Sequence, residues 1–185
     1  MMKFLMIVAL IYSFPHCSAQ ASQSLRFDSS ILSAKGQQAY EALLETETFH
    51  VGDVSIGGYP SGEEKALHAL LEEEAAVEAC RSLIEHATPE GALYGLLGLH
   101  IKDQEVFQQE IECYRMQAEP AERVPAAFAG LKTSEGKPVT IAGSKVMVQR
   151  GCMVSREERL DVVRRIEVGD YDDEFNLSAQ MLSVH

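Results

Sequence analysis

The chain has 185 residues, of which 46% are hydrophobic and 24% are charged, and its net charge is −12 at pH 7. This length suits one ordinary domain, and the apolar fraction is that of a folded chain rather than a disordered one. The acidic balance argues against binding nucleic acid through its phosphates, which needs clustered Lys and Arg. It argues equally against docking on anionic lipid.

The first 19 residues have the three parts of a secretory signal peptide. Lys3 supplies a short basic start, an apolar run of 11 residues extends from Phe4 to Phe14, and small residues follow. The run is shorter than the roughly 20 apolar residues that cross a bilayer. We therefore expect cleavage near Ala19 or Ala21 and export to the periplasm or the cell exterior. The mature form then has no integral membrane span, and without Lys3 its net charge is −13.

The stretch that follows predicts a leader, a helix and an extended segment. Residues 20–30 are polar and predict a flexible leader. A first helix is expected from Ser33 to Glu47. Residues 49–60 are rich in Val, Ile and Gly, and they predict a short extended segment that ends in a turn at Gly57-Gly58.

Residues 61–116 predict four consecutive short helices. Ser61 and Glu64 have the spacing of a capping box, and Thr88-Pro89-Glu90 places a hydroxyl cap, a proline and an acid where a third helix begins. Asp103 begins the fourth helix. Connections this short imply antiparallel neighbours. Small residues in the third helix would let a neighbouring helix approach closely: Gly91, Gly95 and Gly98.

The stretch Thr-Pro-Glu-Gly-Ala-Leu-Tyr-Gly-Leu-Leu-Gly-Leu-His-Ile-Lys-Asp, from Thr88 to Asp103, resembles the linked helix pair of HEAT-type helical repeats. The resemblance covers only residues 61–116, and no third copy follows at a fixed period, as an extended solenoid would require. It implies helical hairpins stacked in a small domain. It also implies a protein-binding surface without catalysis.

The C-terminal third predicts a β-hairpin and a last helix. Two β-rich runs flank Gly143-Ser144 and predict a hairpin at about 138–150. Ser155 and Glu158 have the spacing of a second capping box, so we expect a helix to begin there and to end at Gly169.

The predicted elements together give a mainly α fold, a small bundle of stacked short antiparallel helices with one β-hairpin. It forms a single domain over residues 31–169. Residues 170–185 begin Asp-Tyr-Asp-Asp-Glu and contain no Lys or Arg, which predicts a mobile acidic tail.

Three cysteines remain after cleavage. Cys80 lies on the apolar stripe of its helix, where a cysteine behaves as a small hydrophobic residue. Cys113 and Cys152 lie outside that stripe, and a disulfide between them would join the hairpin to the helices in the oxidising exterior. Three unpaired cysteines are the alternative.

Other chemistry-bearing residues form few patterns. No two histidines have the helical spacing of a zinc pair, so neither a metal site nor a cofactor is predicted. His100 lies on an apolar stripe and is expected to be a hydrogen-bonded core residue. The acids Asp170, Asp172 and Asp173 lack the loop pattern of a calcium site. His50 and Asp53 lie beside a glycine-rich turn and are a possible site.

These observations leave three functional hypotheses. The first is an exported, non-enzymatic protein that binds another protein or an envelope component. The alternative is a small secreted hydrolase or metal-dependent enzyme that uses His50 and Asp53. A third is an envelope redox protein that depends on Cys113 and Cys152.

Phosphate-binding glycine loops and the Gly-x-Ser-x-Gly elbow are both absent from the sequence.

Overall fold

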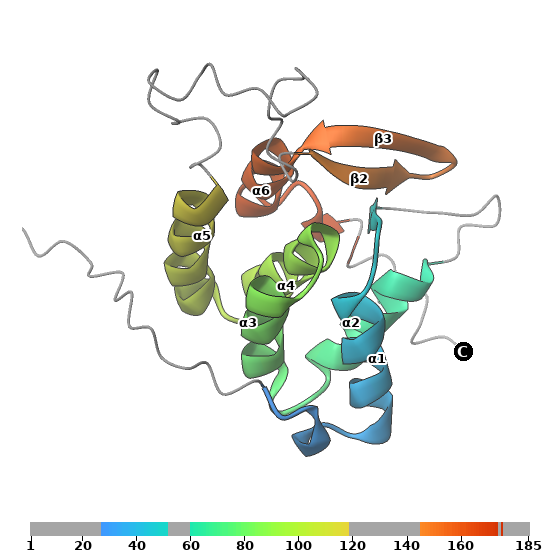
Figure 1. The fold of residues 1–185 in the computed structure, drawn as a ribbon, viewed down its shortest axis with the longest axis vertical. Helices are drawn as coiled ribbons and strands as arrows, with labels where there is room; N and C mark the ends of the chain where they lie inside the picture. The colour runs from blue at the N-terminus through green and yellow to red at the C-terminus, as the bar shows by residue number, and fades with distance from the viewer. Residues whose placement is uncertain (1–26, 52–59, 119–144, 174, 176–185) are drawn as a thin grey trace, which may run out of the picture.

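The computed structural model describes residues 27–51, 60–118, 145–173 and 175, and within them the chain is mainly helical with a small sheet (Figure 1). The predicted fold class, mainly α with a minor β component, is confirmed. The predicted signal peptide, the Gly57-Gly58 turn, Asp53 and the first half of the predicted hairpin lie outside the described residues.

The N-terminal part is helical. A short 3₁₀ turn, η1, is capped by Asp28 and leads into α1. The strand β1 and four more helices follow in the order of the sequence. Their bounds are Ser29–Ile31 for η1, Ala34–Leu44 for α1, Phe49–Val51 for β1, Gly62–Leu71 for α2, Ala76–His86 for α3, Pro89–Lys102 for α4 and Gln104–Ala118 for α5.

Local capping explains why these helices begin where they do. The Ser61 hydroxyl accepts the backbone N–H of Glu64, and the Glu64 carboxylate accepts the N–H of Ser61, which completes the predicted capping box. Thr88 caps α4, with Pro89 at its first position. The Asp103 carboxylate accepts two N–H groups at the start of α5. The four helices predicted over residues 61–116 are therefore confirmed.

Helix α4 is the centre of the molecule, and every residue from Glu90 to His100 is buried. A helix that is apolar around its whole circumference must be covered on all sides. Helices α3, α5 and α6 and strands β1 and β2 pack around it. The predicted close approach is confirmed on its α3 side, because a Cβ added at Gly95 would lie 2.6 Å from the Cys80 carbonyl oxygen.

The sheet has the strand order β1-β2-β3, with β2 over Lys145–Arg150 and β3 over Met153–Glu158. Strand β1 is parallel to β2, and β2 is antiparallel to β3. The two residues between β2 and β3 are Gly151 and Cys152. Gly151, the first of the two, has a φ of 56°. Cys152, the second, does not have a positive φ, because among the described residues only glycines do. A positive φ at the first turn residue alone is the pattern of the type II′ turn of two-residue hairpins.

The hairpin therefore lies C-terminal to its predicted place. Residues 145–149 form a strand as expected, but their antiparallel neighbour is 153–158 and the turn is Gly151-Cys152. The second capping box is wrong, because Ser155 lies in β3 and its hydroxyl donates to Glu157 instead of capping a helix. A two-residue turn at 151–152 places the following residues beside β2, and this pairing prevails over the local helix signal.

The last helix, α6, covers Arg159–Glu167 and begins four residues after Ser155, the predicted start. It is followed by the cap residue Val168 and then by Gly169, the predicted stop. Gly169 has a φ of 76° and closes a Schellman motif, since its N–H donates to Ile166 and the N–H of Asp170 donates to Arg165. Beyond it, in the segment predicted as a tail, Tyr171 and Phe175 are buried against the core.

Candidate interaction surface

His50 is half-buried in the middle of β1, and the structure brings it close to Glu63 at the start of α2. Its Nε2 lies 3.4 Å from a Glu63 carboxylate oxygen, while its backbone N–H donates to the Tyr94 hydroxyl at 2.8 Å. Burial raises the pKa of Tyr94 well above its ordinary value, so this phenol acts only as a neutral hydrogen-bonding group. Asp53, the predicted neighbour of His50, lies outside the described residues.

The predicted Cys113–Cys152 disulfide is not formed. No disulfide joins any two of the cysteines in the described part of the chain, Cys80, Cys113 and Cys152. Cys113 lies on α5, whereas Cys152 is exposed in the β2–β3 turn at the opposite side of the molecule (Figure 1). Helix α6 packs against both α5 and β3 and lies between them, which keeps the two thiols apart.

His100 is buried in the core, as the sequence predicts, and faces the C-terminal segment. Its Nδ1 lies 3.2 Å from Asp172 Oδ1, a distance within ion-pair range. The contact between the imidazole and the carboxylate does not have the geometry of a hydrogen bond. Neither His100 Nδ1 nor Asp172 Oδ1 has a hydrogen-bond partner among the described residues, and the attraction between the two groups is therefore purely electrostatic. No group of three or more metal-ligating side chains occurs within the described ranges.

The most accessible feature of the sheet is the outer edge of β3. Strand β3 pairs with β2 on one side and has no described neighbour on the other (Figure 1). Met153 is 77% exposed and Val154 is 52% exposed, the two apolar side chains that follow the hairpin turn. An open strand edge with exposed apolar residues favours pairing with another chain.

Hydrogen-bond geometry shows which backbone groups of β3 point to this open edge. Met147 lies opposite Arg156, and its N–H donates away from β3 to the buried carboxylate of Glu90 at 2.9 Å. Opposite residues of an antiparallel pair direct their backbone groups the same way, either toward each other or both outward. The N–H and C=O of Arg156 therefore face the open edge, as do those of Val154 and the N–H of Glu158, two residues away on either side.

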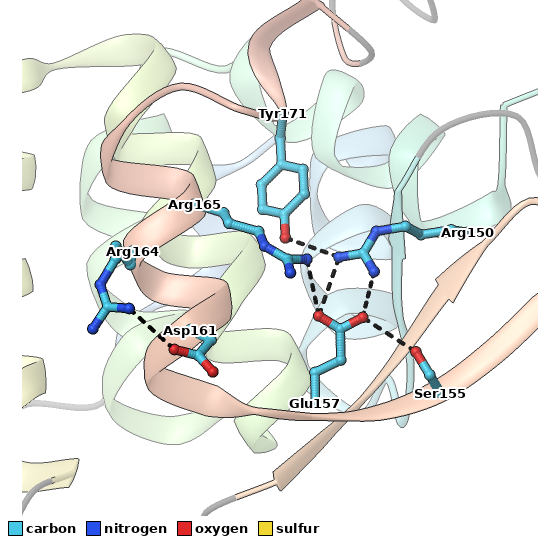
Figure 2. A network of polar contacts seen from close by, with 7 residues as sticks. All are labelled: Arg150, Ser155, Glu157, Asp161, Arg164, Arg165 and Tyr171. Atoms are coloured by element: carbon cyan, nitrogen blue, oxygen red, sulfur yellow. Dashed lines mark hydrogen bonds and ion pairs between the residues drawn. The ribbon is translucent and has the colours of Figure 1, made fainter.

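A partly exposed ionic cluster around Glu157 holds β3 in place (Figure 2). The Glu157 carboxylate, only 15% exposed, accepts from both nitrogens at the end of Arg150 and from Arg165 of α6 at 3.0 Å. Ser155 donates to the same carboxylate, and Arg150 approaches the Tyr171 hydroxyl at 3.4 Å. The hydrogen bond from Arg150 lowers the pKa of Glu157 below 4.5, so the carboxylate is charged at neutral pH.

Charge is divided unevenly between the two parts of the molecule. The described residues from 27 to 118 carry 5 basic and 16 acidic side chains, whereas the hairpin and α6, residues 145–168, carry 6 basic and 4 acidic ones and are followed by three aspartates at 170, 172 and 173. The hairpin and α6 are thus a locally basic unit on an acidic protein. The strand β3 was not predicted from the sequence, because the capping-box spacing of Ser155 and Glu158 assigned residues 155–158 to the last helix.

Within the described ranges no helix is both long enough and apolar enough to cross a membrane. Comparison of the chain with protein-family models, with curated proteins and with solved structures gave no match. The resemblance of residues 61–116 to HEAT-type helix pairs has no support from these comparisons.

Proposed function

We propose that the mature protein is an exported, non-enzymatic binding domain that contacts another protein through the hairpin. The observation that carries this proposal is the open edge of β3, where Met153 and Val154 are exposed beside a strand fixed by Glu157 and its two arginines. A rigid edge with exposed apolar side chains suits recognition, because little conformational entropy is lost when a partner binds.

Site-specific photo-crosslinking tests the proposal. A photoreactive amino acid at position 153 is expected to capture a discrete partner in the exported fraction of the source cell. The matched control carries the same group at Ile31, an apolar residue of η1 that is 61% exposed at the far end of the molecule. The same products from both positions, or none from either, would contradict the proposal.

Export itself is part of the proposal and has a separate test. N-terminal sequencing of the mature protein should begin at Gln20 or Ser22, the residues that follow Ala19 and Ala21. A mature protein that retains Met1 or Lys3 would contradict export by this signal.

We propose a small secreted hydrolase as the second candidate, because the His50 imidazole approaches the Glu63 carboxylate at 3.4 Å. A carboxylate that orients an imidazole is the arrangement that prepares a general base. Hydrolysis of chromogenic esters by the wild-type protein, lost in both His50→Gln and Glu63→Gln with the fold retained, would support it. A wild-type protein without such activity, or activity that survives both substitutions, would contradict it.

A further inference from the structure

We infer that the partner binds as a fourth strand on β3 and presents an acidic side chain to Arg156. This inference rests on the proposed binding function and specifies its chemistry. Two properties of the edge carry it, namely the direction of its backbone groups and the charge around them.

The backbone of β3 offers hydrogen-bonding groups in the spacing that an added strand requires. The register directs the N–H and C=O groups of Val154 and Arg156 and the N–H of Glu158 away from β2, whereas the C=O of Glu158, the N-cap of α6, is used by the first turn of that helix. An extended segment laid along this edge can pair with all three residues, since they lie at the two-residue period of a strand. Side chains give such a segment its specificity.

Arg156 is the side chain that selects the partner. It is exposed on the face of the sheet that also carries Val154, and it forms no ion pair with any described residue. The other charges of the hairpin are already engaged, Arg150 with Glu157 and Lys145 with Glu158. A carboxylate opposite Arg156 and an apolar side chain opposite Val154 would complement this face.

The net negative charge of the protein does not prevent an acidic partner from binding at β3. At physiological ionic strength charges interact over about 8 Å, so an added strand responds to the hairpin and α6 rather than to the distant acidic helices. A second copy of the chain would bring the same basic hairpin against this one, and like charges would disfavour that pairing. The geometry and the charge therefore favour an acidic extended segment of another protein.

A peptide experiment tests the inference. The probe is an eight-residue peptide with Thr at every second position and with Val and Glu alternating at the positions between, so that one face carries both a carboxylate and an apolar side chain; it is compared with one in which Lys replaces Glu. We expect the acidic peptide to bind the mature protein about tenfold more tightly than the basic one, and the affinity to fall as salt is added. Residue-resolved hydrogen exchange should show new protection of the amides of Val154, Arg156 and Glu158.

Two pairs of variants distinguish binding at the edge of β3 from a general effect of charge. Arg156→Glu should reverse the preference between the peptides. Arg164→Glu makes the same charge change on an exposed side chain of α6 and should alter affinity less than about twofold. Val154→Pro removes an N–H that β2 does not use, so it should abolish binding while the fold survives, whereas Val154→Thr should retain binding.

Each outcome has a defined meaning. Equal losses in Arg156→Glu and Arg164→Glu, or binding that survives Val154→Pro, would overturn strand addition. A dimer of the wild-type protein that Val154→Pro dissociates would show that the occupant is a second copy. If position 153 still captures a partner that shows no preference for the acidic peptide, the binding function survives and this inference fails. If position 153 captures nothing, the binding function itself fails.

Discussion

The cysteines illustrate how the environment of a single residue decides its chemistry. Cys80 is fully buried between α3 and α4, and burial raises the pKa of its thiol to about 12. Cys152 is exposed in the hairpin turn. We expect iodoacetamide to modify Cys152 in the native protein without prior reduction and to modify Cys80 only after unfolding, as measured by intact mass. A Cys152 that reacts only after a reductant is added would restore the disulfide hypothesis.

Glu157 is the residue whose loss should disturb the hairpin most. Glu157→Gln leaves Arg150 and Arg165 without their shared carboxylate, and we expect a loss of about 1–3 kcal/mol in the free energy of unfolding at pH 7. Asp161→Asn is the control, because among the described residues Asp161 forms an ion pair only with the exposed Arg164, and its loss should cost below about 0.5 kcal/mol.

The pH dependence of the same variant follows from the lowered pKa of Glu157. A carboxyl group whose pKa is lower in the folded state stabilises the protein above its unfolded pKa of 4.5, and this contribution is lost as the pH falls through the folded value. Urea unfolding should therefore show the difference between wild type and Glu157→Gln shrinking below pH 4.5. A difference that stays constant to pH 3 would contradict the ionic origin.

At the scale of elements, the contact between α3 and α4 depends on glycine. Gly95→Ala adds a methyl group 2.6 Å from the Cys80 carbonyl oxygen, which forces the helices apart. Alanine improves helix propensity by up to about 1 kcal/mol, but the overlap with backbone should prevail and give a net loss of about 1–3 kcal/mol. Gly62→Ala meets nothing within 4 Å and should be neutral or stabilising. Thermal denaturation of both variants tests this, and equal stability would contradict the packing argument.

The elements that the sequence predicted correctly are those specified by neighbours in the chain. Caps such as Ser61, Thr88 and Asp103 act within three residues, so their helices could be located without the tertiary structure. The hairpin could not, because Gly143-Ser144 and Gly151-Cys152 are both plausible two-residue turns. Pairing with β1 and the burial of alternate residues of β2 decide the register, and neither is local.

The candidate site was hidden for the same reason. Glu157 reads as part of a helix start, and only its place in β3 directs it toward Arg150 and Arg165. The glycine at 151, directly after the β-rich run 145–149, is the signal that could have located the hairpin turn and hence the strand. The sequence singled out His50, but its carboxylate neighbour Glu63 is 13 positions away in the sequence and could not be identified.

At the scale of the whole molecule, the C-terminal segment joins the hairpin unit to the helices. Tyr171 contacts Phe49 of β1 edge to face, with ring centroids 5.7 Å apart, and its hydroxyl meets Arg150. The ring of Phe175 stacks on the imidazole of His68 of α2, with ring centroids 3.9 Å apart. Buried aromatic side chains contribute strongly to stability, so this segment links the basic unit and the acidic helices into one cooperative structure.

The stacking of His68 makes that link sensitive to pH. Burial lowers the pKa of His68 from 6.5, although a hydrogen bond with the Phe175 backbone and the nearby Glu72 act in the opposite direction. The unfolded state therefore binds a proton more readily than the folded state, and stability present above pH 6.5 is lost as the pH falls through the folded pKa.

His68→Gln has no proton to bind, so its free energy of unfolding should fall less between pH 7.5 and pH 5 than that of the wild type. His86→Gln, at the exposed end of α3, controls for the loss of one histidine and should follow the wild-type profile. Urea unfolding at both pH values measures the three proteins, and parallel profiles for His68→Gln and the wild type would show that the stacked imidazole does not couple pH to stability.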